Sequence, residues 1–175
     1  MSLAAVIDAQ LAAKGALRWA RNRPLTPSDF KGTPPANTGQ AGAHTEYTII
    51  AGARCNGRTF EYHVTAAVLP SQSWMAPELR RSPAEAARTL HHEQTHFDLS
   101  EVYARKIRRR FADLYDPCGQ TEVALQAFSD ALVKDEAREQ VRYDEESNHG
   151  RAALSQADWD RQVATWLDAL DKYGK

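Results

Sequence analysis

The segment from Ala84 to Asp116 contains neither glycine nor proline, and its apolar residues recur with the spacing of a helix. One apolar position recurs every seven residues, at Leu90, Phe97, Ala104 and Phe111. These residues form an apolar stripe along one side of the helix. The sequence therefore predicts one long helix over about 83–115. The full chain of 175 residues is long enough to build a core around that helix within one domain.

Signals at both ends support this helix. Ser82 suits the N-cap, Pro83 suits the first helical position, and Glu85 would complete a capping box with Ser82. At the other end, Asp116–Gly119 contains a proline and a glycine, which stop a helix. We therefore expect the helix to begin at Pro83 and to end before Asp116.

Within this helix, His92, Glu93 and His96 form an H-E-x-x-H motif. Residues four apart lie on the same helical face, so both imidazoles can aim a nitrogen at one metal ion. Nitrogen ligands suit Zn²⁺, and zinc lowers the pKa of its water to about 7. Glu93 then stands next to that water and can take its proton as a general base. The motif predicts zinc-dependent hydrolysis, most often of a peptide bond.

A catalytic zinc ion normally has three protein ligands, so the motif leaves one ligand to be found. Asp98 and Glu101 lie on the same helix but are rotated away from the two histidines, which leaves Glu101 as a remote alternative. A second helix, packed antiparallel to the first, would bring its far end back to the motif. His149 is the only histidine there and is the predicted third ligand, with Asp144 and Glu145 as alternatives.

Three neighbours of His149 receive supporting roles. Gly150 would let the backbone turn tightly enough to present the imidazole. Asp144 would accept the other N–H of a ligand imidazole and so orient its ring. The hydroxyl of Tyr143 is a candidate donor to the oxyanion that forms on an attacked carbonyl.

The other elements are shorter or less regular. Residues 46–51 and 59–69 are rich in β-branched and aromatic residues, and Asn56-Gly57 between them is a strong hairpin signal. A second long helix is expected from Thr121 to about 148, and a last one from Ser155. In the second long helix, the predicted apolar residues are Val123, Leu125, Phe128, Leu132, Val133 and Val141. The sequence also predicts a short helix over 3–13, a strand within 16–20 and a mobile loop over 33–43.

These elements predict an α+β fold, with a small antiparallel β-sheet followed by long helices. The chain is expected to form a single domain over residues 1–175. Its sheet region would span about 16–70 and its helical region about 83–173. We expect this organisation to be zincin-like, the arrangement of metallopeptidases with an H-E-x-x-H helix.

Charge and hydropathy exclude several classes of partner. Lys plus Arg is 22 and Asp plus Glu is 23, so the sequence gives no support for binding to nucleic acid or to a membrane surface. No apolar run approaches the roughly 20 residues of a membrane span. The first residues lack a basic leader and are not expected to act as a signal peptide. The basic run at 105–110 is expected to be a solvated helix face.

Several blocks of the chain are similar to the DUF922 family, described as predicted secreted bacterial zinc-dependent proteases. The matching residues are Trp19, Pro24–Thr26, Asp29–Gly32, His92–Glu101 with Ala104 and Arg105, Tyr143–Gly150, Gln156 and Trp159. The last block resembles Y-D-x-E-T-x-H-G, and Ser147 stands here where threonine is usual. The resemblance covers most of the chain. It implies zinc hydrolysis in a periplasmic or extracellular setting and does not imply a particular substrate.

An exported chain meets oxidising conditions, in which a pair of cysteines tends to form a disulfide. Cys55 lies at the hairpin turn and Cys118 at the stop between two helices. We hypothesise a Cys55–Cys118 disulfide, with two separate thiols as the alternative.

The sequence thus favours a zinc metallopeptidase with a peptide or protein substrate, Glu93 as general base and Zn²⁺ as cofactor. Two alternatives stay open. One is another zinc hydrolase, such as an amidase acting on cell-wall peptide. The other is a non-catalytic, zinc-stabilised binding module, which a fully closed site with four ligands would favour.

Overall fold

A computed structural model describes residues 1–38 and 42–174. Its order is α1 (Leu3–Ala13), β1 (Leu17–Arg18), β2 (Ala43–His44), β3 (Tyr47–Asn56), β4 (Thr59–Val68), β5 (Trp74–Met75), α2 (Pro83–Ala112), α3 (Glu122–Ser147) and α4 (Ala153–Ala169). Short 3₁₀ turns η1 to η4 lie at Pro27–Asp29, Leu79–Arg81, Pro117–Gly119 and Asp171–Tyr173. A small antiparallel sheet with four α-helices in the described part of the chain confirms the predicted α+β class.

The main sheet is an antiparallel hairpin, β3–β4, with β1 added along β4. Asn56 pairs with Thr59, so the turn residues are Gly57 and Arg58, one position later than expected. The positive φ of 61° at Gly57 explains the glycine in this turn. The predicted hairpin is confirmed, although its first strand is longer than predicted.

A second, two-stranded sheet pairs β2 with β5. β2 begins at the end of the loop predicted over 33–43, of which residues 39–41 lie outside the described part. Strands this short are set by tertiary contacts and carry no periodic pattern, so β2 and β5 are not predicted from the sequence, whereas β1 falls within the strand predicted over 16–20.

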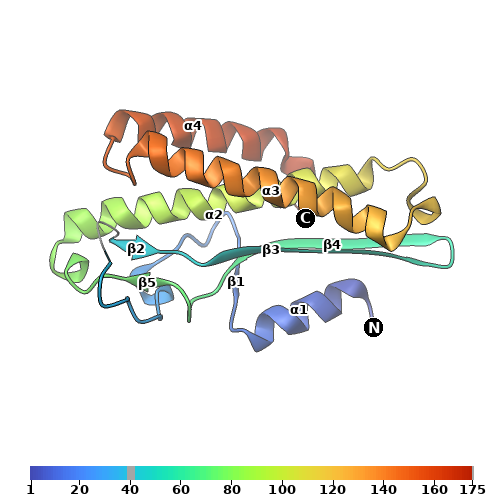
Figure 1. Cartoon of the computed structure of the whole chain (residues 1–175), viewed down its shortest axis with the longest axis horizontal. Helices are drawn as coiled ribbons and strands as arrows, with labels where there is room; N and C mark the ends of the chain where they lie inside the picture. Colours follow the sequence, from blue (N-terminus) through green and yellow to red (C-terminus); the bar gives the residue numbers. More distant parts are fainter. Residues whose placement is uncertain (39–41, 175) are drawn as a thin grey trace.

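Helix α2 lies between the sheet and the other long helices (Figure 1). Toward the sheet it buries Phe97, Ala104, Ile107 and Phe111, the face predicted from the seven-residue repeat. Toward α3 and α4 it buries a second set, Leu99, Val102 and Tyr103, together with Tyr143, Trp159, Val163 and Leu167. Helix α1 covers the opposite face of the sheet through Ile7 and Leu11. The motif therefore stands on a helix that is packed on two sides.

Helix α3 buries only part of the predicted apolar face: Leu125 is buried, and Phe128 and Leu132 pack against the core. Val123 and Val141 are 79% and 57% exposed. The face turned toward α2 is largely polar, with Ser129, Glu136, Gln140 and Tyr143 buried. The reason is that the partner groups on α2 are themselves polar, so hydrogen bonds decide the interface.

Three helix ends differ from expectation. Pro83 begins α2 as predicted, but the side chain of Ser82 makes no capping hydrogen bond. α2 ends at Ala112, three residues before the predicted end. α4 begins at Ala153 rather than at Ser155, because Ala152 occupies the N-cap.

Only part of the basic run on α2 is solvated: Arg109 and Arg110 are exposed, whereas Arg105 and Arg108 are buried. Glu101 and Arg105 are each 3% exposed, and Arg108 is 9% exposed. Glu101 Oε1 accepts hydrogen bonds of 2.9 Å from both arginines. Arg108 also donates to the carbonyl oxygens of Val64 and Tyr173. Buried charges persist only when paired in this way, and here they tie the sheet and the C-terminal segment to α2.

A disulfide joins Cys55 to Cys118, with the two Cα atoms 5.7 Å apart. The hypothesised pairing is confirmed. It fastens the end of the hairpin to the segment between α2 and α3, and it fits an extracellular location. Among the described residues, no helix has the length and apolar character needed to cross a bilayer.

Candidate metal centre

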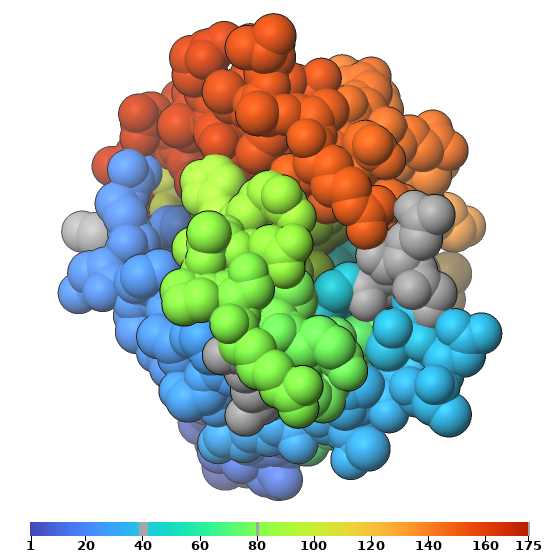
Figure 2. Space-filling view, turned by 90° about the vertical axis from the view of Figure 1, so that its left-hand side faces the viewer, coloured from blue at the N-terminus to red at the C-terminus, as the bar shows by residue number. Residues whose placement is uncertain are grey.

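The two motif histidines are buried in the first half of α2. Figure 2 views the molecule from the side on which the start of this helix, in light green, lies at the front. Their Nε2 atoms are 3.1 Å apart. Two nitrogens bound to zinc at about 2.0–2.1 Å in tetrahedral geometry lie about 3.3 Å apart. The spacing of His92 and His96 therefore fits one zinc ion.

The other ring nitrogens are held by two glutamines. The Nδ1 of His96 is 2.6 Å from the Oε1 of Gln140, and the Nδ1 of His92 is 3.3 Å from the Oε1 of Gln156. The amide nitrogen of Gln140 donates to a carboxylate oxygen of Glu136 at 2.7 Å and to the carbonyl of His96 at 2.9 Å. These bonds fix the amide orientation of Gln140, and a bond of 2.9 Å from the amide nitrogen of Gln156 to Asp160 fixes that of Gln156. Each Gln oxygen therefore accepts from an Nδ1–H.

This arrangement has a direct electrostatic consequence. With Nδ1 protonated, each neutral imidazole turns the lone pair of its Nε2 toward the other ring. Two acceptors 3.1 Å apart repel each other unless a cation lies between them. Both Nε2 atoms are therefore available to bind a metal ion or an added proton.

Asp144, in the last turn of α3, lies against the same point. Its Oδ1 is 3.0 Å from the Nε2 of His92, 3.0 Å from the Nε2 of His96 and 3.3 Å from the Nδ1 of His149. One donor atom each from His92, Asp144 and His149 lie within 4.8 Å of one another. Antiparallel packing of α3 on α2 therefore brings the predicted region back to the motif.

The turn after α3 positions His149. Asn148, His149 and Gly150 have φ values of 48°, 51° and 75°, three successive left-handed residues. Left-handed backbone is uncommon outside glycine and is often retained at functional sites. A Cβ added to Gly150 would lie 2.8 Å from the Cβ of His92. Only glycine allows this turn to pack directly against the motif helix.

The charges at the centre are mutually dependent. Burial lowers the pKa of His96, but the hydrogen bond that its protonated ring donates to Asp144, together with the charges of Glu93 and Asp144, outweighs burial and raises that pKa overall. Burial raises the pKa of Asp144, but hydrogen bonds donated by His92 and His96 outweigh burial and hold that pKa well below its usual range. Asp144 is therefore ionised and adds negative charge where a cation would bind.

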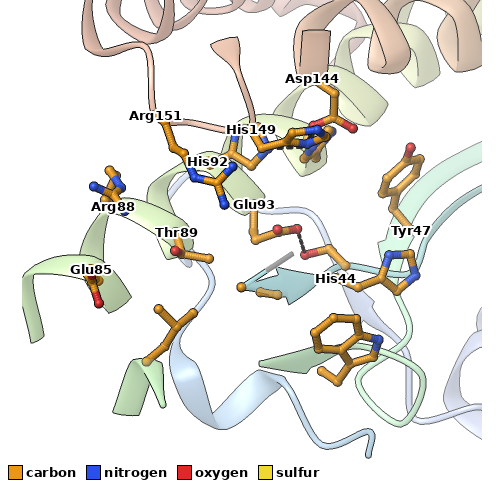
Figure 3. A pocket seen from close by; sticks show the side chains of 16 residues that line it. His44, Tyr47, Glu85, Arg88, Thr89, His92, Glu93, Asp144, His149 and Arg151 are labelled. Carbon is orange, nitrogen blue, oxygen red and sulfur yellow. Dashed lines mark hydrogen bonds and ion pairs between the residues drawn. The ribbon is translucent and has the colours of Figure 1, made fainter. Parts of the chain in front are cut away.

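Glu93 lies beside this cluster at a cavity of about 520 Å³ (Figure 3). Its Oε2 accepts a hydrogen bond of 2.6 Å from the hydroxyl of Thr45, the residue that follows β2. The cavity is lined by Gly42–Thr45, Tyr47, Trp74, Leu79, Glu85, Arg88, Thr89, His92, Glu93, His96, Asp144, His149 and Arg151. The candidate base thus faces the same space as His92, His96 and His149.

Residues 28–150 match the family described as bacterial protein of unknown function, DUF922. The chain belongs to the DUF922 family. The matched segment contains the H-E-x-x-H motif, Asp144 and His149, and it ends at Gly150. Comparison with curated proteins and with solved structures gives no match.

Three residues of this DUF922 protein that the sequence offered for the site do not line the cavity. Tyr143 is fully buried, and its hydroxyl donates to Gln156 at 2.8 Å and to the carbonyl of His92 at 3.2 Å. It supports the histidine from behind and does not line the cavity. Glu101 belongs to the buried arginine cluster, and Glu145 is exposed outside the cavity lining.

Other residues at the site were not singled out for it by sequence. Tyr47 lines the cavity and stacks on His96 with ring centroids 6.1 Å apart, and burial raises the pKa of its hydroxyl. Thr45 and Gln140 carry no local motif. Gln156 is the exception, because it was among the residues that resemble the family.

Proposed function

We propose that this DUF922 protein is a zinc-dependent hydrolase that cleaves peptide bonds, with a zincin-like active site. The observation that carries the proposal is the pair of Nε2 atoms, 3.1 Å apart, with both Nδ1 atoms bound by glutamine oxygens. Such fixed ring orientation is typical of metal-binding histidines. A buried carboxylate on the next residue of the motif is the second part of a hydrolytic site.

A zinc ion held by His92 and His96 would supply a Lewis acid that makes water acidic near neutral pH and polarises a carbonyl group. Glu93 acts as general base: it takes a proton from the attacking water and passes it to the leaving amine. The hydroxyl of Thr45 holds one carboxylate oxygen of Glu93, so the other oxygen is left for the water.

His149 is proposed as the third ligand, and the left-handed turn that directs it toward His92 supports this assignment. Asp144 would neutralise and orient the ligand imidazoles. Because its Oδ1 is as close to both Nε2 atoms as they are to each other, Asp144 is the rival for the same position. Were both bound, the site would close with four ligands, which is the arrangement of the zinc-stabilised binding module.

The edge of β2 favours an extended peptide as substrate. The carbonyl of Gly42 accepts from the amide of Ala76 at 2.8 Å, on the β5 side. Because main-chain groups alternate in an antiparallel pair, those of Ala43 and Thr45 point away from β5. An extended peptide can add to such an edge beside Glu93. The confirmed disulfide supports a periplasmic or secreted setting for this reaction.

The proposal is tested by Glu93→Gln. We expect the variant to keep its zinc, because Glu93 is a base and not a ligand. Hydrolysis should fall by about 10²-fold or more, the usual contribution of a general base. Cleavage of a mixed peptide library is followed by mass spectrometry, with zinc content measured on the same samples. Glu145→Gln, an exposed change on α3, is the matched control. Equal turnover in Glu93→Gln and wild type would remove Glu93 from the mechanism.

A further inference from the structure

Two arginines line one side of the cavity. Arg88 stands four residues before His92 on α2, so it lies on the same helical face, about 6 Å along the axis. Arg151 follows Gly150, which packs against His92. Figure 3 shows Arg88 and Arg151 on the side of His149, away from Tyr47. This end of the cavity is therefore cationic.

Three carboxylates line the same cavity as these arginines, and two of them, Glu93 and Asp144, lie at the histidines. Glu85 also lines the cavity and offsets one of the two positive charges. It lies almost one turn before Arg88, farther from the histidines. Among the described residues, Arg88 makes no ion pair of its own, and its side chain is exposed to the cavity. The carboxylate of a bound ligand would pair with the positive charge at this end of the cavity.

The direction of the edge strand β2 determines which end of a bound peptide would lie near Arg88 and Arg151. Gly42 lies beside Thr89, because an added Cβ would be 3.5 Å from its Oγ1. Farther along, Thr45 bonds to Glu93 and Tyr47 stacks on His96. The strand segment and α2 therefore run in the same direction past the site.

A peptide added antiparallel to this edge would run from the Tyr47 end toward the Gly42 end. Its C-terminal part would then reach Arg88 and Arg151, within about two residues of the cleaved bond at about 3.3 Å per residue. A parallel peptide would instead bring its amino end to the arginines. The positive charge of the two arginines therefore favours the antiparallel peptide, whose carboxyl end lies beside them.

We infer that Arg88 and Arg151 bind a substrate carboxylate on the C-terminal side of the cleaved bond. The inference rests on the proposed function and names its substrate class: peptides with a carboxylate within about two residues of the cleavage point. That carboxylate is either the free C-terminus or an acidic side chain, and both offer the planar acceptor that a guanidinium binds.

Binding can be measured without turnover. Three pentapeptides labelled with fluorescein at the N-terminus are titrated by fluorescence anisotropy: a free acid, its C-terminal amide, and an amide with glutamate as the penultimate residue. Zinc-loaded Glu93→Gln protein binds without cleaving. Zinc-free wild-type protein serves as a second host, in which a carboxylate cannot bind to the metal.

We expect the free acid to bind about tenfold or more tightly than the plain amide in both hosts, the effect of a charge-assisted hydrogen bond. Arg88→Gln and Arg151→Gln should each reduce that ratio, and Arg58→Gln, at the hairpin turn, should leave it unchanged.

Tight binding of the glutamate peptide would identify an acidic side chain as the source of the carboxylate. Weak binding of that peptide would identify the free C-terminus. Equal affinity for all three peptides, or a preference for the carboxylate-bearing peptide that is unchanged in Arg88→Gln, would overturn the inference. The anisotropy result stands apart from the library assay, because wild-type protein that fails to cleave peptides contradicts the proposed function alone.

Discussion

At the scale of single residues, the centre depends on side chains behind the histidines as much as on the motif itself. Gln156 accepts from His92 and from Tyr143, and its amide nitrogen donates to Asp160 at 2.9 Å. One amide thus fixes the orientation of a ring, a hydroxyl and a carboxylate. Loss of such a partner usually lowers metal affinity.

Gln156→Leu is expected to lower zinc affinity about 10–100-fold, because the Nδ1–H of His92 loses its acceptor. Competition with a fluorescent zinc chelator measures the change. Gln162→Leu, an exposed position on the same helix, is the control. If the two variants bind zinc equally well, the glutamine does not set the ring orientation.

At the scale of elements, α2 combines two functions. Its first half carries the motif, and its second half carries Glu101, whose carboxylate binds Arg105 and Arg108. These buried charges hold the sheet and the C-terminal segment against the helix. The site is therefore carried by an element that is fixed along most of its length.

Glu101→Gln is expected to destabilise the fold by about 3–5 kcal/mol, since it leaves two buried guanidinium groups without their anion. Urea unfolding measures the loss, and Glu122→Gln at the exposed start of α3 should cost little. The zinc content of folded Glu101→Gln should stay unchanged. A stability equal to that of the control would show that the cluster adds nothing to the packing of α2.

The elements also show what the sequence could predict. Local signals identified α2, the hairpin and the H-E-x-x-H triplet, because each depends on neighbours within a few residues. Tyr47, and not Tyr143, lines the cavity because of the way the sheet packs on α2. No local sequence pattern predicts this packing. The same holds for Gln140 on the polar face of α3 and for the buried arginines.

At the scale of the whole molecule, the N-terminal segment is fastened to the motif helix. The indole nitrogen of Trp19 donates to Asp98 at 2.7 Å, and the amide of Leu25 donates to the side-chain oxygen of Gln94 at 2.7 Å. The loop that follows is closed by Asp29, which binds Arg23 through both carboxylate oxygens. The loop before the sheet is thereby coupled to the stability of the site.

Asp29 gives this coupling a pH dependence. The hydrogen bond from Arg23, with further bonds from Thr26, lowers the pKa of Asp29 from 3.8 to about 2. A lowered pKa stabilises the fold above the unfolded value of 3.8, and the contribution is lost as the pH falls through 2. Asp29→Asn should therefore cost about 1–2 kcal/mol at neutral pH.

The difference between Asp29→Asn and wild type should shrink as the pH falls below 4 and vanish below 2, because the wild-type carboxyl is then protonated in both the folded and the unfolded state. Thermal unfolding across this range measures it. A difference that is independent of pH would show that the ion pair with Arg23 is not the source of the stability.

The central claim is that His92, His96 and His149 hold one zinc ion beside Glu93. Its most direct test is the zinc content per chain of purified protein, measured by elemental analysis for wild type and for single variants. We predict about one zinc per chain in wild type and in Glu93→Gln, and loss of the metal in His96→Ala. His149→Ala should weaken binding strongly, and Asp144→Asn should weaken it about 10–100-fold. A wild-type chain that takes up no zinc, or a His96→Ala chain that keeps it, would contradict the account.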